Sequence, residues 1–255
     1  MPLQIHQFPC LKDNYCWLVH EPEARLTAVV DTPEVAPILK ALDETGWRLT
    51  HILNTHWHPD HAGGNEELKA RTGCEVIGPR GEAKRIPAID RQVGDGDEVK
   101  FGAVTARVFD VPGHTAGHIA YWFAGEKVAF VGDTLFALGC GRLFEGTAQQ
   151  MWTSLQKLMA LPPETAVYCA HEYTQSNARF ALSVDGGNPD LVARAKEIDA
   201  MRARGEATVP SSIGLELKTN PFLRAADPQL QRSLGMEGAD PVAVFAETRR
   251  RKDNF

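Results

Sequence analysis

The residues best suited to chemistry in this sequence form one short run, in which His56, His58, Asp60 and His61 fall within six positions. Neutral imidazole nitrogens and carboxylate oxygens are ordinary ligands of zinc and similar divalent cations. His56 and His58 are two residues apart, as on one side of an extended strand, and Pro59 then turns the chain. The later two side chains therefore approach from another direction. Two ligand pairs that point differently favour two adjacent cations over one.

Three further polar residues stand after short apolar runs that are rich in valine and aromatic residues, at His114, Asp133 and His171. Such runs are typical of buried strands, although periodicity alone does not exclude buried helix. Polar residues just beyond strand ends are where α/β sheets place their sites. Each of these residues taken alone reads more readily as a hydrogen-bonded core residue. Taken with the first cluster, they read as ligands.

The candidate ligands number seven, five histidines and two aspartates. A tetrahedral zinc ion takes four ligands, so seven around one ion would leave no open position. Two cations about 3.5–4 Å apart, with a bridging carboxylate and a bridging hydroxide, would use all of them. The count therefore predicts a binuclear metal site.

The ligand pattern resembles that of the metallo-β-lactamase superfamily. A narrower likeness, to the glyoxalase II (hydroxyacylglutathione hydrolase) family, rests on motifs outside the ligands and extends over nearly the whole chain, to residues 252–253. The Gly-Cys-Gly loop, the Asn-Pro-Phe segment and the basic C-terminus carry it most specifically. The matching segments are 113–118, 132–136, 139–142, 144–147, 171–174 and 219–224.

The resemblance implies two divalent metal ions per chain, with zinc expected and iron or manganese as alternatives. Two carboxylates are candidate catalytic residues: by the resemblance Asp133 bridges the metals, and Asp60, as a ligand of the second metal, can orient the attacking hydroxide. The implied ligands are His56, His58 and His114 for the first metal, Asp60, His61 and His171 for the second, and Asp133 for both.

The same resemblance places glutathione-binding positions at Arg142, Phe144, Tyr173, Arg249 and Lys252. Many relatives have lysine and tyrosine where this chain has Arg142 and Phe144; arginine keeps the cation, whereas phenylalanine loses a hydroxyl. The basic run that ends at Lys252 also has a plainer interpretation, because cations in a last helical turn are favoured by the helix dipole. Without the resemblance, the run would be interpreted as a solvated helix end.

The implied activity is hydrolysis of S-(2-hydroxyacyl)glutathione, with S-D-lactoylglutathione giving glutathione and D-lactate, the second step of methylglyoxal detoxification. A hydroxide between two cations is available near neutral pH, and a thiolate leaves readily because a free thiol has a pKa of about 8.5. Three alternatives remain: a persulfide dioxygenase with one iron, an RNA-processing nuclease and a non-catalytic binding module. The complete ligand set argues against the first and third, and the net charge of −6 argues weakly against the second.

Composition is that of a globular enzyme, with 43% hydrophobic and 24% charged residues in 255. Before about residue 175, short apolar runs alternate with polar stretches, and segments 98–110 and 118–131 have the pattern of hairpins. After it, strand signals fade, and helices are predicted to begin at Asn188–Pro189 and Asp240–Pro241. We expect an α/β (α+β) fold. By the resemblance, this is an αββα sandwich over residues 1–174, followed by a small helical substrate-binding domain over 175–255.

The first residues lack a basic segment followed by an apolar one, and no apolar run reaches the length of about 18 residues that a membrane span needs. Five scattered cysteines suit reduced thiols. We therefore expect a cytoplasmic monomer that acts on a small thioester and binds neither membrane nor nucleic acid. Asp31 is expected to support the site, His118 either to support it or to pack in the core, and Cys140 and Cys169 to be inert buried thiols.

Overall fold

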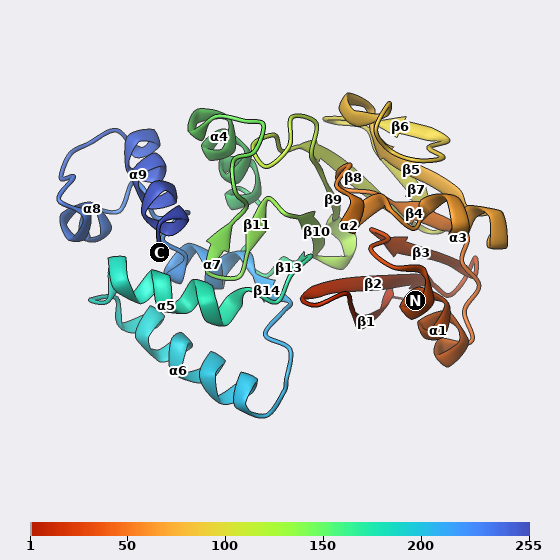
Figure 1. Ribbon diagram of the computed structural model, residues 1–255, viewed down its shortest axis with the longest axis horizontal. Helices are drawn as coiled ribbons and strands as arrows, with labels where there is room; N and C mark the ends of the chain where they lie inside the picture. Colours follow the sequence, from red (N-terminus) through yellow and green to blue (C-terminus); the bar gives the residue numbers. More distant parts are fainter. Residues whose placement is uncertain (1) are drawn as a thin grey trace. The chain divides into compact units, whose positions relative to one another are not determined.

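The computed structural model describes residues 2–255 (Figure 1). The chain divides into two compact units that are not contiguous in sequence. The first comprises Met1–Asp110 and Thr115–Gly132, and the second comprises Val111–His114 and Asp133–Phe255. Within residues 2–255, no helix has both the length and the apolar character needed to cross a bilayer.

The first unit contains a six-stranded mixed sheet in which the strands follow one another in chain order. β1, β2 and β3 pair antiparallel, and β3 to β6 pair parallel. β3 is an almost continuous buried run, as expected of a strand covered on both faces. The strands are β1 (Gln4–Cys10), β2 (Asn14–Glu21), β3 (Leu26–Val30), β4 (His51–Leu53), β5 (Glu75–Pro79) and β6 (Arg91–Val93).

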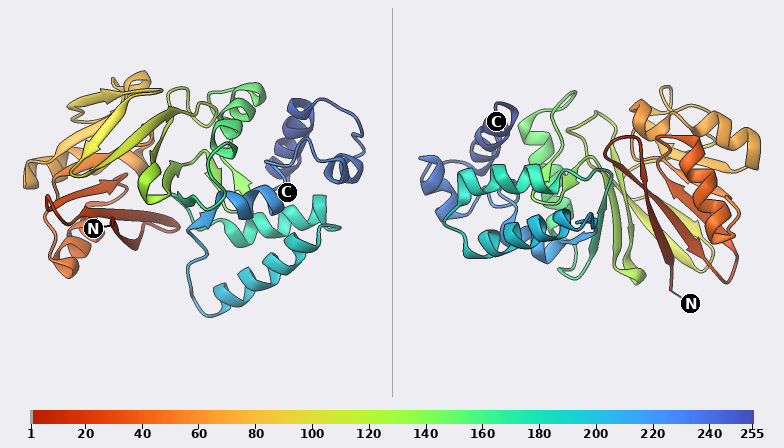
Figure 2. Two further views of the ribbon diagram at one scale, coloured as in Figure 1. Left: turned by 180° about the vertical axis from the view of Figure 1, so that it is seen from behind. Right: turned by 60° about the horizontal axis from the view of Figure 1, so that its bottom comes forward.

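Helices α1 (Val35–Thr45), α2 (Pro59–Ala62) and α3 (Asn65–Thr72) belong to the same unit. Ile38 and Leu42 of α1 pack with Val29 and Ile52 of the sheet in one buried cluster, so α1 covers one face of the sheet (Figure 2). Apolar burial of this kind, at about 25 cal/mol per Å², is the main force that holds the helix to the sheet.

A second, antiparallel arrangement in the first unit is formed by β7 (Glu98–Phe101), β8 (Val104–Asp110), β9 (Ile119–Phe123) and β10 (Val128–Gly132). The 3-10 helix η2 (Ala124–Glu126) connects the last two strands. Tyr121 donates a hydrogen bond to the carbonyl oxygen of Asn54 at 2.9 Å, and the rings of Phe101 and His51 lie 5.4 Å apart. The two sheets therefore pack face to face, and both predicted hairpins are confirmed.

The second unit is mostly helical. It contains two short antiparallel pairs, β11 with β12 and β13 with β14, and its helices α5 and α6 lie side by side (Figure 1). Its elements are β11 (Leu135–Phe136), β12 (Gly139–Cys140), α4 (Ala148–Met159), β13 (Ala166–Cys169), α5 (Thr174–Asp185), α6 (Pro189–Ala203), β14 (Ser211–Ser212), α7 (Ile213–Thr219), α8 (Pro228–Leu234) and α9 (Pro241–Asp253).

Local capping explains where several of these helices begin. The side chain of Asn188 accepts hydrogen bonds from the first turn of α6, and Asp240 caps α9 in the same way. Both predicted helix starts are thus confirmed. Thr147 and Gln150 form a reciprocal capping box at the start of α4.

The predicted domain boundary between residues 174 and 175 stays a prediction. In the structure, segment 133–174 belongs to the same compact unit as the C-terminal helices. Helix α4 packs on α9, for example, and the rings of Trp152 and Phe245 lie 6.1 Å apart.

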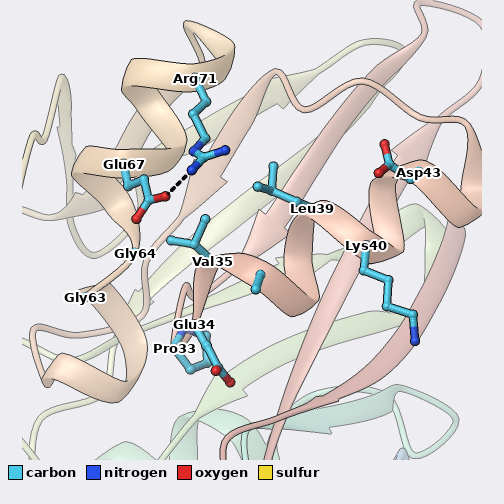
Figure 3. A pocket seen from close by; sticks show the side chains of 11 residues that line it. Pro33, Glu34, Val35, Leu39, Lys40, Asp43, Gly63, Gly64, Glu67 and Arg71 are labelled. Carbon is cyan, nitrogen blue, oxygen red and sulfur yellow. Dashed lines mark ion pairs between the residues drawn. The ribbon is translucent and has the colours of Figure 1, made fainter.

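A groove on the first unit is lined by α1 and the chain from α2 to α3 (Figure 3). Val35 and Leu39 contribute apolar side chains from α1, and an ion pair of 2.7 Å joins Glu67 and Arg71 on α3. The candidate metal ligands are not among its lining residues in the described part of the chain.

Candidate metal centre

Four of the seven candidate ligands come together in the first unit. His56 and His58 lie in the irregular segment after β4, and Asp60 and His61 lie in α2. His56 Nε2 and His58 Nδ1 are 3.0 Å apart, and His61 Nε2 is 3.4 Å from Asp60 Oδ2. His56 and His61 are buried, whereas the other two are partly exposed. We call these four residues the first half-site.

The expectation that His56 and His58 share one side of a strand is wrong. β4 ends at Leu53, and the backbone donors of Thr55 and Trp57 bond to side chains instead of a neighbouring strand. Thr55 N donates to Asp31 Oδ1 at 2.8 Å, and Trp57 N donates to Glu82 Oε2 at 2.8 Å. The two imidazoles are therefore carried on a loop whose shape two buried carboxylates fix.

Asp31 orients two of these histidines. Its Oδ2 accepts hydrogen bonds from Thr55 Oγ1 at 2.7 Å and from His61 Nδ1 at 2.8 Å. Thr55 Oγ1 in turn lies 3.0 Å from His56 Nδ1, from which it accepts because its own proton goes to Asp31. Each histidine is thus held in the tautomer that has its proton on Nδ1 and a free lone pair on Nε2.

Asp31 also lies close enough to His56 and His61 for all three to present ligand atoms within 4.8 Å of one another. Its oxygens, however, are engaged by Thr55 and His61, which suits the supporting part expected of it. Its backbone has a φ of +58°, a left-handed conformation that is uncommon outside glycine. Such strain persists where the surrounding contacts determine the conformation.

The remaining three ligands come together in the second unit, where they form the second half-site of His114, Asp133 and His171. Asp133 Oδ2 lies 3.5 Å from His114 Nε2 and 3.4 Å from His171 Nε2. All three side chains are buried. One carboxylate oxygen between two imidazoles is the arrangement expected of a residue that contacts two cations.

The donor chemistry of this half-site fits a cation. His114 Nδ1 lies 3.0 Å from the carbonyl oxygen of Arg142, which only accepts, so Nδ1 carries the proton. Nε2 then presents a lone pair to the carboxylate of Asp133. Two acceptors that face each other in a buried place repel unless a positive charge lies between them. In the first half-site, His61 Nε2 likewise lies 3.4 Å from Asp60 Oδ2, although the side chain of Asp60 is partly exposed.

Glycine is required at position 141 of the Gly-Cys-Gly loop. A Cβ atom there would lie 2.0 Å from the carbonyl oxygen of Asp133 and 3.1 Å from His114 Nδ1. The loop therefore passes very close to Asp133 and His114, and it can do so because residue 141 has no side chain.

Two aromatic side chains with substantial exposure border the second half-site. The ring of Phe144 lies 5.2 Å from that of His114, and the ring of Tyr173 stacks on that of His171 at 4.7 Å. Phe144 is 61% exposed and Tyr173 is 37% exposed, unusual values for large hydrophobic residues beside buried histidines. Both positions suit contact with a ligand that approaches this half-site.

Lys252 lies in a positively charged environment near the end of α9. Its Nζ is 3.4 Å from Ser176 Oγ and 5.4 Å from the centre of the Phe180 ring. Burial, followed by the charges of Arg249, Arg142 and Arg179, lowers the pKa of this ammonium group to about 8. An anionic ligand would relieve that repulsion.

Arg249, by contrast, is buried and engaged within the protein. Its Nη1 donates to the carbonyl oxygen of Cys140 at 2.9 Å, and its Nη2 lies 2.8 Å from Asp253 Oδ1. The guanidinium also covers the ring of Phe222 at 5.0 Å. Contact between Arg249 and a substrate stays a prediction, and these internal contacts give the residue a further part in the structure.

The cysteines are consistent with the expectation of inert thiols. Burial raises the pKa of Cys140 to about 11 and that of Cys169 to about 12. Neither sulfur is therefore a thiolate near neutral pH.

Comparison with known proteins shows two family models that together match residues 15–255. The metallo-beta-lactamase superfamily model matches residues 15–171, and the model described as hydroxyacylglutathione hydrolase C-terminus matches residues 172–255. The hydroxyacylglutathione hydrolase of Methylococcus capsulatus is 57% identical over 253 residues, which is 99% of each chain. That of Rhizobium etli is 58% identical over 254 residues, covering 100% of this chain and 99% of the relative.

Among solved structures, the crystal structure of ETHE1 from Myxococcus xanthus matches with a TM-score of 0.67 at 26% sequence identity. The match covers 99% of this chain and 98% of that one. The fold of that structure therefore extends over nearly the whole chain, and the sequence likeness is much greater to the hydrolases.

Proposed function

Because the chain belongs to the hydroxyacylglutathione hydrolases of the metallo-β-lactamase superfamily, we infer that it hydrolyses S-(2-hydroxyacyl)glutathione thioesters. With S-D-lactoylglutathione the products are glutathione and D-lactate, so the enzyme acts in the second step of methylglyoxal detoxification. The observation that carries this conclusion is that hydrolases of that name match the chain from end to end at more than half identity.

We propose that the two half-sites together form one binuclear centre. His56, His58 and His114 would hold one divalent cation, and Asp133 would be shared. Asp60, His61 and His171 would hold the other. Support comes from the internal order of each half-site: Asp133 Oδ2 lies within 3.5 Å of two histidines, and Asp31 holds His61 at 2.8 Å. Zinc is the metal we expect, with iron and manganese as alternatives that this donor set also accepts.

Such cations, when bound, would lower the pKa of a water held between them and polarise the thioester carbonyl. The remaining work falls to the chain's own residues. Asp60 would orient the attacking water, and Asn14 Nδ2 holds its Oδ2 at 3.2 Å. The departing thiol needs no strong acid in the protein, because its pKa is about 8.5.

The substrate's tripeptide would lie against the second unit. Phe144 and Tyr173 offer exposed rings beside the second half-site. Arg142 and Lys252 supply positive charge for the carboxylates of glutathione, and Arg249 adds to that charge from its buried position. The phenylalanine at 144 gives apolar contact without a hydrogen bond.

We further propose that the enzyme works as a monomer in the cytoplasm, without nucleic-acid or membrane partners. One chain supplies all seven proposed ligands, so a second copy is not needed to complete the site. The five cysteines are free thiols, which suits a reducing compartment. A net charge of −6 gives no general attraction to nucleic acid.

The test is turnover of S-D-lactoylglutathione by purified, metal-loaded protein, with thioester loss and thiol release recorded together. We expect one thiol per thioester consumed. A glutathione persulfide with oxygen uptake, and an RNA substrate, should give no comparable turnover. Release of no thiol by protein that carries its metals, or faster reaction with either rival substrate, would overturn the proposal.

A further inference from the structure

Glu82 is a buried carboxylate that the proposed reaction does not use. It lies at the end of the 3-10 helix η1 (Arg80–Glu82), directly after β5, and is 2% exposed. Its Oε2 accepts a hydrogen bond from Trp57 N at 2.8 Å, and its Oε1 accepts one from Gly117 N at 2.8 Å. One side chain thus joins two backbone segments that are 60 residues apart (117 − 57).

Both segments carry proposed metal ligands. Trp57 lies between His56 and His58, and Gly117 is the third residue after His114. Neither Trp57 nor Gly117 is in a strand, since β4 has ended at Leu53 and β9 begins at Ile119. Both N–H groups are partly buried, and the Glu82 carboxylate accepts from each of them in place of a neighbouring strand.

The contact is sterically close. A Cβ atom on Gly117 would lie 2.6 Å from Glu82 Cγ and 3.0 Å from the carbonyl carbon of Gly81. Glycine at 117 therefore lets the loop approach the carboxylate, and little room remains for either to shift.

The same turn also holds the indole of Trp57. The guanidinium of Arg85 lies over this ring at 4.3 Å, and its Nη2 is 3.7 Å from Glu82 Oε1. The indole also meets the ring of His58, with 4.7 Å between centroids. Glu82 thus fixes the backbone of Trp57, while Arg85 fixes the side chain that packs on His58.

We propose that Glu82 is a positioning residue for the metal centre, which sets the orientation of His56 and His58 through the backbone of Trp57. The inference rests on the proposed function, because it assigns these histidines to the metal. Partners of this kind, one contact away from the ligands, typically change metal affinity about 10- to 100-fold when they are lost.

The chain offers a closely matched control in Glu21, a fully buried carboxylate at the end of β2 in the same unit. Glu21 accepts hydrogen bonds from Ala24 N at 2.7 Å and Glu23 N at 3.3 Å. It too packs on a glycine, since a Cβ atom on Gly102 would lie 3.0 Å from its Cγ. Glu21→Gln and Glu82→Gln therefore make the same chemical change in similar surroundings.

Glu82→Gln replaces one carboxylate oxygen by the NH2 group of an amide. That group is itself a donor, so it cannot accept the hydrogen bond from the backbone N–H that it faces. We expect the Zn²⁺ dissociation constant, measured by competition with a chelator, to rise about 10- to 100-fold. Glu21→Gln should leave it within about twofold of the unmodified chain, even if both variants melt at lower temperatures. In Co²⁺-loaded protein, the ligand-field absorption bands should change in the first variant alone. Equal effects of the two variants on metal binding, or no effect of Glu82→Gln, would overturn the proposal.

Glu82→Asp provides a second variant if Glu82→Gln does not fold. It keeps the charge and withdraws the oxygens by one methylene, so metal affinity should again fall; unchanged affinity in the folded protein would contradict the proposal. The metal measurements involve no thioester. A failure of the unmodified chain to hydrolyse S-D-lactoylglutathione would therefore count against the proposed function, separately from the part assigned to Glu82.

Discussion

Arg249 donates a hydrogen bond from Nη1 to the carbonyl oxygen of Cys140 at 2.9 Å, across 109 positions of sequence. Arg142, two residues beyond Cys140, offers its carbonyl oxygen to His114 Nδ1 at 3.0 Å. The last helix of the chain is therefore tied to the loop that holds a proposed metal ligand in its tautomer. The C-terminal region therefore has a structural connection to the second half-site in addition to its proposed contacts with substrate.

Replacement of Arg249 and of Lys252 by alanine should separate the structural role of the C-terminal region from its proposed contacts with substrate. Arg249→Ala should weaken metal retention and also raise the KM for a glutathione thioester, because it releases the Cys140 loop and removes a cation. Lys252→Ala should raise that KM about 10- to 100-fold, the loss of a charge-assisted hydrogen bond of roughly 1.5–3 kcal/mol, while metal content is unchanged. Elemental analysis and steady-state kinetics measure both. Identical effects of the two substitutions would show that no such division exists.

Asp133→Ala should lower both metal content and turnover. The carboxylate lies between His114 and His171, and without it each proposed cation loses an anionic ligand while the two repel each other. Elemental analysis after desalting, with turnover measured on the same sample, checks this expectation. The exposed Asp199 gives a control, since Asp199→Ala should change neither quantity. Full loading with full activity in Asp133→Ala would refute the bridging assignment.

Thr55 provides a test of the hydrogen-bond chain from Asp31 to His56. Thr55→Val removes the hydroxyl that donates to Asp31 and accepts from His56, so the metal dissociation constant should rise about tenfold or more. Thr55→Ser keeps the hydroxyl and should bind metal nearly as the unmodified chain does. A chelator competition assay distinguishes them. If valine and serine bind metal equally well, the hydroxyl has no part in orienting His56.

The charge of Lys252 predicts a dependence of substrate capture on pH. Its pKa of about 8 lies below the ordinary value of 10.5, so the side chain is a cation at pH 7 and becomes neutral as the pH rises through about 8. If that charge attracts a substrate carboxylate, kcat/KM for the glutathione thioester should fall over this interval. Lys252→Arg should abolish this component, because arginine stays charged. A fall of equal size in the arginine variant would assign it to another group.

Much of the candidate site can be predicted from the local sequence pattern. The spacing around His56 and the position of Asp133 after an apolar run predict metal ligands directly, and the structure places these residues beside other candidate ligands. The helix starts at Asn188 and Asp240 are equally local, because a capping side chain acts on the two or three residues that follow it.

The residues that support the ligands are harder to predict from sequence, because their hydrogen-bond partners are distant along the chain. Asp31 requires a left-handed backbone and hydrogen bonds to Thr55 and His61, 24 and 30 positions away. Thr55 could have been suspected from its place next to His56. Nothing in the pattern around Glu82 indicates that its carboxylate accepts hydrogen bonds from the backbone of Trp57 and of Gly117, in two segments that carry proposed ligands. Likewise, a basic run at a helix end predicts solvent exposure or anion binding, not the burial of Arg249.

Titration of the metal-free protein with Zn²⁺, with thiol release from S-D-lactoylglutathione recorded at each addition, tests the binuclear thioesterase most directly. Seven ligands in two half-sites predict that bound metal rises to two equivalents per chain and that full activity requires both. Saturation of binding and activity at one equivalent, unchanged by excess metal, would contradict the shared role of Asp133 and with it the binuclear centre.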